Sequence, residues 1–419
     1  MSPSTRLTAG TGSSAVVERC QICDSAELDP VLFLGYLPPV NQMWPIGHTP
    51  GEQPAYPALL LRCRHCQLVQ LGLVVDPKIL FPPEYPYSSG TTRILRENFA
   101  ELCREAAPLL HLEPGDLIVD IGSNDGTLLS NFQQAGFRVH GIEPTQMGAL
   151  AQERGIPTTL SFLTADAADR VRREQGPAKV VTATNVFAHI EDVHAVVENI
   201  RRLLATDGTF ISESHYLLSL VETLQYDTIY HEHLRYYSLT SVQHLLARHG
   251  LEVFFAKRIP THGGSIRIYA APKGVRPVDP AAAAIERQET ALSAEALGEF
   301  KQRVVRSKLD LYGILQTIKA AGQRIYGIGA PSRASTLINY VGLDDGILDC
   351  VLEIKGSQKI GKYLPGTLIP VVDESRLFDD PPDYALLLSW HIAEELTGKL
   401  RSKGYQGRFL IPLPEPRIV

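Results

Sequence analysis

Residues 117–272 alternate short apolar runs with runs of helical periodicity. Strand-like runs such as LIVDI and KVVTAT are separated by helix-like runs such as GALAQERG and EDVHAVVENIRRLL. Parallel strands need crossover connections, which helices usually supply, so this alternation predicts a parallel sheet with helices on both faces. The last two strand-like runs, 251–261 and 264–272, have only His262 and Gly263 between them. Such a link is too short for a crossover and predicts an antiparallel hairpin at the end of the sheet.

A glycine-containing loop follows the first of these strands. Residues 120–126 read Asp-Ile-Gly-Ser-Asn-Asp-Gly and precede a helix-like run, and Gly122 and Gly126 allow the backbone to approach a ligand closely. Glu143 stands at the tip of the second strand, where its carboxylate can accept hydrogen bonds from both ribose hydroxyls of an adenosine. Together they predict an adenosine-containing cofactor; an N-cap at Asp125 and a solvated surface acid at Glu143 are the simpler alternatives.

The closing hairpin helps to choose between two such cofactors. Dinucleotide-binding Rossmann domains usually lack it, whereas residues 110–272 resemble the sheet of the class I methyltransferases, which ends in this way. The resemblance implies S-adenosylmethionine (SAM) in place of NAD, with Asp120, Asn124 and Asn185 also beside the cofactor. Asn124 stands where the commonest methyltransferase loop has a third glycine, so the contacts of this residue stay open.

Four of the six cysteines form two identically spaced pairs, Cys20 and Cys23 in CQIC and Cys63 and Cys66 in CRHC. Two CxxC turns supply the four thiolates of a closed tetrahedral zinc site. The separation of the pairs exceeds that of a zinc ribbon, so the segment between them must loop out and return. A disulfide and unrelated buried thiols are the alternatives. Because four sulfurs leave no open coordination position, we expect Zn²⁺ to stabilise the fold without taking part in catalysis.

A segment rich in reactive side chains follows the fifth strand. Residues 226–237, YDTIYHEHLRYY, hold two histidines, two acids, an arginine and four tyrosines. Both this segment and His189, after the fourth strand, emerge beyond the carboxyl ends of the parallel strands, where ligands bind. His231 and His233 do not share a helix face, and two ligands fall short of a zinc site, so we expect acid–base chemistry in place of a metal. For the last two tyrosines a core role is the simpler interpretation.

The order of the motifs is itself informative: CxxC…CxxC, PPEYPYSSGTT, VDIGSNDGTLL, NVFAHIED, YDTIYHEHLRYYSL and THGGSIRIYA. In this order they resemble the sugar C-3-methyltransferases of deoxysugar antibiotic biosynthesis, and the likeness spans nearly the whole chain. The resemblance implies a zinc module, a SAM-binding domain and a C-terminal Rossmann-like domain around a dTDP-linked 4-keto-sugar. It also implies that His233 is the base, that Tyr230 shares this role or binds the enolate oxygen, and that Glu232 and His189 orient groups or relay protons.

A proline-rich linker precedes the central sheet. Prolines at positions 82, 83 and 86 exclude a helix before about Thr91, where helix formers take over. We expect Tyr85 and Tyr87 of this linker to close over the ligands, Tyr85 at the substrate and Tyr87 at the cofactor. His231 is also expected to contact the substrate.

A second glycine-rich turn lies in the C-terminal part of the chain. Residues 325–334, IYGIGAPSRA, read as a strand, a turn and a helix start, and further strand-like runs follow, which predicts a second parallel sheet. By resemblance this turn, with Ser332 and Arg333, binds the substrate pyrophosphate. A tight packing turn is the alternative.

The length of 419 residues suits about three domains. We predict a zinc module over 1–88, a SAM-binding domain over 89–273, a helical connection over 274–322 and a Rossmann-like domain over 323–419. A formal net charge of −6 disfavours nucleic acid as a partner. Without an apolar run of membrane-spanning length, we expect a cytoplasmic monomer with no membrane partner.

Three other functions stay open from the sequence. These are a SAM-dependent O-methyltransferase of a sugar nucleotide, an NAD-dependent oxidoreductase or epimerase of sugar nucleotides, and a non-catalytic scaffold that binds zinc and a nucleotide sugar. An oxidoreductase would explain both glycine turns. A scaffold would leave the reactive side chains of YHEHL unexplained. O-methylation needs only removal of a hydroxyl proton, while C-methylation needs a base for the carbon beside a ketone and a donor for the enolate oxygen.

Overall fold

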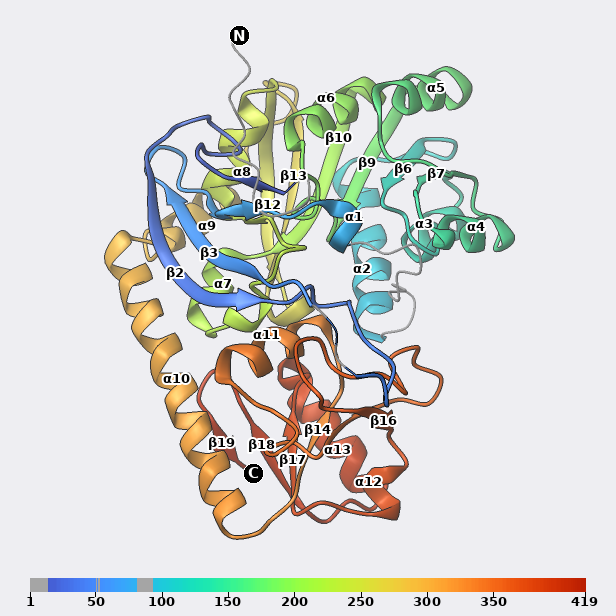
Figure 1. Cartoon of the computed structure of the whole chain (residues 1–419). Coiled ribbons are helices and arrows are strands. Elements are labelled where there is room, and N and C mark those ends of the chain that lie inside the picture. Colours follow the sequence, from blue (N-terminus) through green and yellow to red (C-terminus); the bar gives the residue numbers. More distant parts are fainter. Residues whose placement is uncertain (1–13, 50, 52, 81–92) are drawn as a thin grey trace.

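The computed structural model describes residues 14–49, 51, 53–80 and 93–419 (Figure 1). Sheets of four, seven and six strands organise this part of the chain, and a two-stranded sheet accompanies the first. The seven-stranded sheet lies at the centre of the sequence, and the six-stranded sheet forms the lower body in Figure 1.

The seven-stranded sheet has the order β12-β13-β10-β9-β6-β7-β8. Its strands are β6 (Leu117–Ile121), β7 (Arg138–Ile142), β8 (Thr158–Thr159), β9 (Ala178–Thr184), β10 (Leu204–His215), β12 (Leu251–Ile259) and β13 (Ser265–Pro272). β13 runs antiparallel to both β12 and β10, and the remaining neighbours in the sheet are parallel. The predicted parallel sheet with a closing antiparallel hairpin is therefore confirmed.

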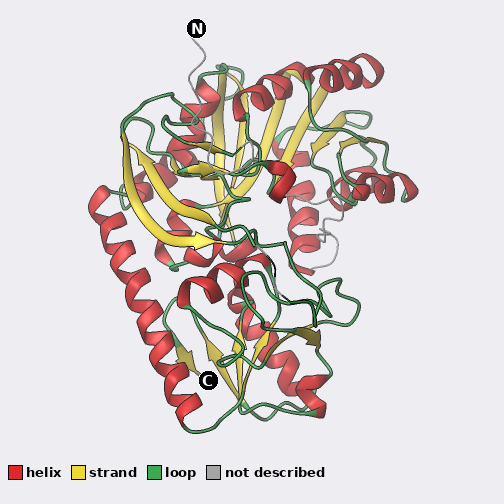
Figure 2. Cartoon of the chain, in the orientation of Figure 1, coloured by secondary structure: helices red, strands yellow, loops and turns green. Residues whose placement is uncertain are grey.

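Helices cover both faces of this sheet (Figure 2). They are α2 (Arg93–Leu109), α3 (Thr127–Gln134), α4 (Gln146–Glu153), α5 (Ala165–Gln175), α6 (Val193–Leu203), α7 (Leu217–Glu222) and α8 (Leu239–Ala247). Alternate residues of one strand enter different cores: Ile118 and Val180 pack with Phe99 of α2, whereas their neighbours Val119 and Val181 belong to the larger core. Burial on both faces explains why these strands are continuous apolar runs.

The N-terminal four-stranded sheet has the order β11-β4-β3-β2. Its strands are β2 (Leu28–Leu37), β3 (Tyr56–Cys63), β4 (Val69–Leu71) and β11 (Arg235–Tyr236), while β1 (Ala15–Val16) pairs with β5 (Leu73–Val74) and α1 spans Pro77–Leu80. β11 directly follows the YHEHL motif and pairs antiparallel with β4. The segment with the reactive side chains is therefore anchored to the N-terminal sheet, which the sequence did not predict.

The C-terminal sheet has the order β16-β15-β14-β17-β18-β19. Its elements are β14 (Ile325–Ile328), α11 (Ser332–Val341), β15 (Cys350–Glu353), β16 (Val371–Asp373), α12 (Arg376–Asp379), β17 (Tyr384–Leu387), η4 (Trp390–Ile392), α13 (Ala393–Ser402), β18 (Arg408–Ile411) and β19 (Arg417–Ile418). The predicted second parallel sheet is present, with an antiparallel edge strand, β19, in addition.

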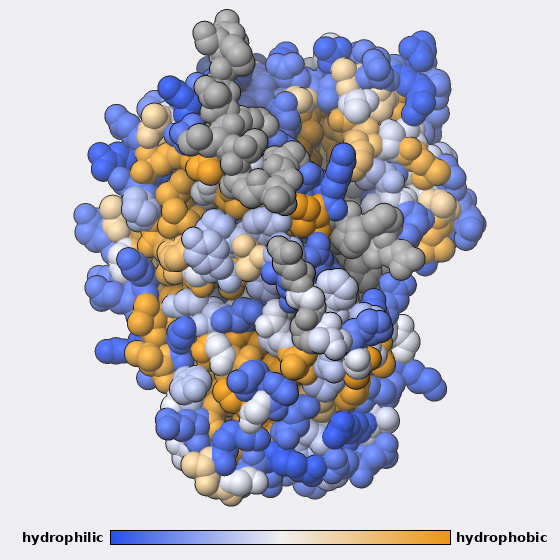
Figure 3. Space-filling model, in the orientation of Figure 1, coloured by the Kyte–Doolittle hydropathy of each residue, from blue (hydrophilic) through white to orange (hydrophobic). Residues whose placement is uncertain are grey.

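Two helices precede this sheet, α9 (Pro280–Glu289) and the long α10 (Ala294–Ala320). α10 runs along one side of the molecule, beside β2 and the C-terminal sheet (Figure 1). Apolar side chains gather on the surface along this side, where Phe33 and Leu309 are exposed (Figure 3). No helix in the described residues has the length and apolar character needed to cross a lipid bilayer. The bounds predicted for the domains stay predictions.

Candidate functional site

The carboxyl ends of four neighbouring parallel strands form one edge of the seven-stranded sheet, called here the carboxyl edge. β7, β6, β9 and β10 are consecutive in the sheet and run in the same direction. Glu143 follows β7, the loop 120–126 begins at the end of β6, Asn185 follows β9, and His215 ends β10. The topology thus brings the predicted cofactor residues to a single edge, where open α/β sheets bind ligands.

The first glycine loop is packed so closely against its neighbours that it has no space for side chains at Gly122 and Gly126. Gly122 has a φ of +68°, and a Cβ built on it would lie 2.5 Å from Cγ2 of Val186. Gly126 has a φ of +76°, and Asn124 adopts the same left-handed region with a φ of 49°. Such values are costly for most side chains and tolerated by asparagine, so Asn124 can replace the usual third glycine.

Glu143 is held in place from the same loop. The backbone N–H of Asn124 donates to Oε2 of Glu143 at 3.0 Å, and the N–H of Thr145 donates to Oε1 at 2.9 Å. The Glu143 residue is only 5% exposed, so the alternative of a solvated surface acid is wrong. A carboxylate has about four acceptor positions, so two bonds leave capacity for ribose hydroxyls.

Other polar atoms at the carboxyl edge fit a polar ligand. Oγ of Ser123 and Oδ1 of Asn185 are buried and have no hydrogen-bond partner in the part of the chain that is described. Asp120 is buried and accepts a hydrogen bond from Oγ1 of Thr182 at 2.6 Å. Burial raises the pKa of Asp120 to about 7, the nearby carboxylate of Glu143 adds to this rise, and the bond from Thr182 opposes it.

A cluster of histidine and tyrosine rings lies at the same edge. The ring centroid of His233 is 4.1 Å from that of Tyr230, 4.9 Å from that of His189 and 4.8 Å from that of His215. His262 continues the cluster, with its centroid 5.2 Å from that of His215. The structure therefore brings the predicted residues Tyr230, His189 and His233 together and adds two histidines that the sequence analysis missed.

Backbone contacts fix the YHEHL segment against the loop after β9. The N–H of Leu234 donates to the carbonyl of Ala188 at 2.9 Å, and the Arg235 guanidinium donates to the carbonyls of Ile190 and Glu191. The loop that carries His189 begins with the predicted cofactor residue Asn185. The loop after β9 thus connects the predicted cofactor residues with the predicted catalytic residues.

The tautomer of His233 follows from its hydrogen bond. Its Nδ1 lies 2.8 Å from the carbonyl oxygen of Thr228. A carbonyl only accepts, so Nδ1 carries the proton and Nε2 keeps its lone pair in the neutral ring. Burial, together with the nearby His189, holds the pKa of His233 well below its usual value, and burial likewise lowers the pKa of His189 to about 4. Both rings are neutral at pH 7.

Burial has the opposite effect on Tyr230. Loss of solvation, and then the charge of Glu232, raise the pKa of its phenol well above the usual value. Tyr230 therefore keeps its O–H at neutral pH and is available as a hydrogen-bond donor beside the neutral His233.

Glu232 connects the cluster to the other two sheets. Nδ2 of Asn41, from the loop after β2, donates to Oε1 of Glu232 at 2.7 Å. Oγ of Ser332, at the start of α11, lies 3.4 Å from Oδ1 of the same asparagine. Asn41 is a site residue that the sequence analysis missed, because its position in the LPPVNQM loop carries no motif.

His231 lies apart from its neighbour His233. Its Nε2 is 3.3 Å from the carbonyl of Pro57, and its ring stands edge-on to Tyr56 of β3. The structure thus packs His231 against the N-terminal sheet, and its predicted contact with substrate stays a prediction. Tyr236 and Tyr237 are 1% and 0% exposed, which agrees with a core role.

Arg333 has a buried partner that the sequence did not reveal. Its Nε and Nη2 donate to the two carboxylate oxygens of Asp227 at 2.7 and 2.8 Å, and its guanidinium lies 4.8 Å above the ring of Trp390. Nε1 of Trp390 also donates to Asp227, at 2.7 Å. These contacts join η2 (Tyr226–Thr228) to α11 and η4. Arg333 was predicted to bind an anion of the substrate, but in the structure its charge is already paired with that of Asp227.

The second glycine turn has its own acidic partner. The N–H of Ala330 donates to Oε1 of Glu353, at the end of β15, at 2.6 Å, and Nζ of Lys359 donates to the carbonyl of Ala330 at 2.5 Å. Burial lowers the pKa of Lys359, against the opposing influence of Glu353 and Glu232. Lys359, like Asn41, lies near the site and was missed by the sequence analysis.

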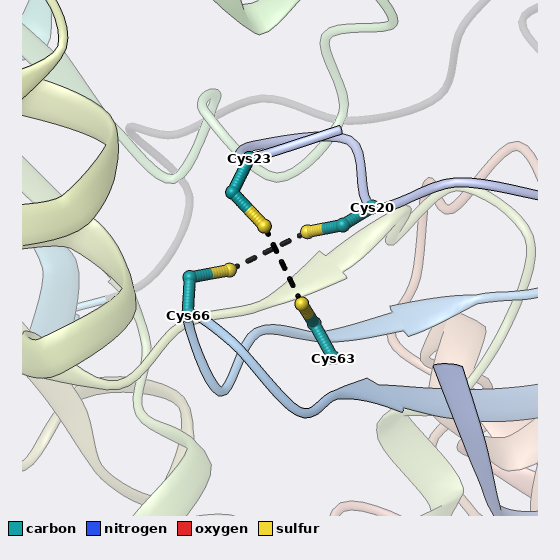
Figure 4. Close-up of side chains that lie close together, drawn as sticks. All are labelled: Cys20, Cys23, Cys63 and Cys66. Carbon is teal, nitrogen blue, oxygen red and sulfur yellow. Dashed lines mark hydrogen bonds between the residues drawn. The ribbon is translucent and has the colours of Figure 1, made fainter. Parts of the chain in front are cut away.

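The four cysteines of the two CxxC turns come together in the N-terminal part (Figure 4). Their sulfurs lie within 4.8 Å of one another, with Cys20 to Cys66 and Cys23 to Cys63 at 3.4 Å. These separations are too long for a disulfide, near 2.05 Å, and suit sulfurs about 2.3 Å from a shared Zn²⁺. The predicted site therefore has the donor set and geometry of a closed structural zinc site.

Two residues of the proline-rich linker cannot be placed. Tyr85 and Tyr87 lie in segment 81–92, outside the described residues, so their predicted contacts stay predictions. His215 and His262 were missed although a signal was available. For His215 the signal was its position: it ends β10, just as His189 follows β9. Because ligands bind beyond the carboxyl ends of parallel strands, His215 could have been predicted in the same way as His189.

Three family models match consecutive parts of the chain: a proposed zinc binding domain over residues 20–81, a methyltransferase domain over 94–254 and a C-methyltransferase C-terminal domain over 260–414. The C-methyltransferase NovU of Streptomyces niveus is 32% identical over 409 residues, which cover 96% of this chain and 97% of NovU.

Solved structures match the chain in part. The PH0226 protein of Pyrococcus horikoshii OT3 is 17% identical, with 48% of this chain and 99% of that protein covered and a TM-score of 0.37. Magnesium protoporphyrin IX methyltransferase of Synechocystis with bound SAH is 17% identical, with 42% and 82% covered and a TM-score of 0.34. These likenesses cover less than half of the chain, so the family models and NovU carry the assignment.

Proposed function

The chain belongs to the C-methyltransferase family that includes NovU, and from this premise we propose that it adds a methyl group from SAM to carbon 3 of a dTDP-linked 4-keto-deoxysugar. Membership makes the chain a SAM-dependent C-methyltransferase with a zinc-binding module, in place of an NAD-dependent oxidoreductase or a scaffold. The sugar, its nucleotide and the methylated carbon are the parts that we propose.

One observation supports carbon as the acceptor: a neutral histidine with a free Nε2 lone pair stands beside a protonated tyrosine at the carboxyl edge. A ketone acidifies the hydrogen on the neighbouring carbon, so a base can remove it and leave an enolate. Nε2 of His233 accepts this proton, and the Tyr230 O–H donates to the enolate oxygen as charge develops there. The structure supports the hydrogen-bonding role for Tyr230, because its raised pKa makes the phenolate a costly base.

Glu232 and His189 act on these two residues. Asn41 holds the Glu232 carboxylate, which stands next to His233 in the chain, and His189 contacts the His233 ring from the loop that follows β9. Both residues hold the His233 ring in position for proton removal. We assign them positioning roles.

Bound SAM supplies an electrophilic methyl group on a sulfonium. Within this chain, Glu143 would hold the ribose, and the loop at Gly122 would approach the ligand with its backbone. The polar atoms of Ser123 and Asn185, which have no partner among the described residues, would contact the cofactor's polar groups. A closed set of four sulfurs keeps Zn²⁺ out of the reaction and makes it a structural ion.

We place the nucleotide part of the substrate between the catalytic segment and the C-terminal sheet. Ser332 begins α11, and the amino end of a helix favours anions such as a pyrophosphate. Since Asp227 already neutralises Arg333, we expect Ser332 and the helix end to provide the main contact, with Arg333 fixing the position of α11. All three sheets contribute residues within one chain, which supports a monomer as the active unit.

Mass spectrometry of the product tests this function. The protein would be given SAM and a dTDP-linked 4-keto-deoxysugar that carries deuterium at carbon 3. We expect the sugar to gain one methyl group and lose the deuterium. In His233→Asn the rate should fall at least ~100-fold, since general-base catalysis contributes about that much. The matched control is His111→Asn at an exposed histidine. A methyl group on oxygen with the deuterium retained would identify an O-methyltransferase and contradict the proposal.

A further inference from the structure

Methylation of carbon leaves one proton behind in every turnover. The C–H bond is replaced by a C–C bond, and the sulfonium loses its positive charge when it gives up the methyl group, so a proton must leave the protein before the next turnover. On the proposed function this proton first resides on His233, which is only 4% exposed. A buried imidazolium with a strongly lowered pKa must pass its proton to another group.

His215 and His262 extend from His233 as a chain of rings. The His215 ring lies 4.8 Å from the His233 ring and 5.2 Å from the His262 ring, centroid to centroid, and both contacts are edge-on. At such separations one water can join the nitrogens of neighbouring rings. Both His215 and His262 are more exposed than His233. Nε2 of His262 is buried without a hydrogen-bond partner among the described residues.

The backbone holds His262 in an unusual conformation to place its ring there. In η3 (Thr261–Gly263) its φ is 56°, in the left-handed region, which few residues other than glycine adopt and in which asparagine, aspartate and histidine are enriched. The turn is packed tightly, since a Cβ on Gly263 would lie 2.7 Å from Gln225 and one on Gly264 would lie 2.6 Å from Ser219. Strained backbone of this kind concentrates at functional sites.

We propose that His215 and His262 form a proton relay that carries the proton from Nε2 of His233 to water. The electron pair of the broken C–H bond stays on the substrate as the enolate and then forms the new C–C bond. The proton passes from His233 to His215 and on to His262, each ring accepting it on one nitrogen and releasing one from the other. Water takes the final proton, and no oxidant or reductant is needed.

The charges around the relay favour release. Burial holds the pKa of His215 well below its usual value, the neighbouring His233 adds to this effect, and burial lowers the pKa of His262 to about 4. Neither relay ring therefore retains the proton for long.

Hydrogen exchange tests the relay separately from methyl transfer. With S-adenosylhomocysteine in place of SAM, the protein should wash deuterium from carbon 3 of the 4-keto-sugar into water, as His233 removes the deuteron and the relay disperses it. His262→Asn keeps a residue that tolerates positive φ, and His215→Phe keeps the ring. In both variants the trapped deuteron returns to carbon, so we expect washout to fall about tenfold or more.

The matched control is His111→Asn, which replaces another left-handed histidine, with a φ of 52°, far from the cluster in the fold. Its washout should equal that of the unmodified protein. In the relay variants the first turnover with SAM should slow much less than the steady-state rate, because only later turnovers need a discharged His233. Added imidazole should restore part of the steady-state rate, which a merely structural defect would not allow.

Two results would overturn the relay. Washout at the normal rate in both variants would show that the proton leaves by another route. A first turnover that slows as much as washout would show that these histidines act on the substrate itself. If the proposed function itself were wrong, the result would differ: the unmodified protein would methylate its substrate while the sugar retained the deuterium at carbon 3.

Discussion

The Asp227–Arg333 pair joins the catalytic segment to the C-terminal sheet, and its removal should destabilise the protein strongly. The two side chains are 0% and 7% exposed, and both carboxylate oxygens accept from the guanidinium at 2.7 and 2.8 Å. Asp227→Ala leaves a buried guanidinium without its counter-charge and takes the acceptor from Nε1 of Trp390. Breaking a buried pair in this way costs about 3–5 kcal/mol.

An exposed pair with nearly identical geometry provides the control. Arg64 donates to both oxygens of Asp29 at 2.8 and 2.7 Å, but these side chains are 62% and 39% exposed. Asp29→Ala should therefore cost only about 0–1 kcal/mol, because solvent already screens the pair. The difference between the two alanine variants isolates the effect of burial from that of geometry.

Urea unfolding followed by circular dichroism measures both changes. The double variant Asp227→Leu with Arg333→Met removes both charges and should recover much of the loss, since apolar replacements of a buried pair are tolerated better than a single unpaired charge. Equal losses in Asp227→Ala and Asp29→Ala would refute the reasoning, and so would a double variant less stable than Asp227→Ala.

Three further predictions concern the cofactor loop, the zinc site and pH. Gly122→Ala should weaken SAM binding at least ~10-fold in calorimetry, because the neighbouring valine leaves no space for a Cβ in the cofactor loop. Gly115→Ala, which also has a positive φ but open space around it and lies outside this loop, should not weaken SAM binding. Metal analysis should find one zinc per chain, and Cys63→Ser should lose it and lower the melting temperature, while Cys103→Ser should keep it. Burial lowers the pKa of His231 to about 4, so the unfolded chain binds its proton more readily and stability falls as pH drops below about 6.5. His231→Phe should remove about 2 kcal/mol of the stability difference between pH 7 and pH 5 in urea unfolding, and an unchanged difference would contradict this.

Much of the central fold could be predicted because local patterns specify it. Strands buried on both faces must be apolar throughout, and a link of two residues permits only a hairpin, so the parallel sheet and its closing hairpin follow from sequence. The CxxC spacing likewise specifies a four-sulfur cluster. The roles assigned to His233, Tyr230 and the other site residues stay predictions.

Contacts between distant segments could not be predicted in this way. Asn41 meets Glu232 across 191 positions, and Arg333 meets Asp227 across 106. No local pattern marks either partner, since a single asparagine or aspartate is compatible with many surroundings. The sequence suggested a free Arg333 at an anion site, whereas the structure gives it a buried counter-charge.

The sequence by itself determined which elements form and which residue types stand at the carboxyl ends of the strands, because periodicity, turn length and ligand spacing act over a few residues. The tertiary structure alone decided that His231 packs against the N-terminal sheet while His233 enters the histidine cluster, that Nδ1 of His233 is the protonated nitrogen, and that His215 and His262 continue the cluster. These properties depend on which carbonyls and rings other segments bring to each histidine, and burial then sets the proton affinities.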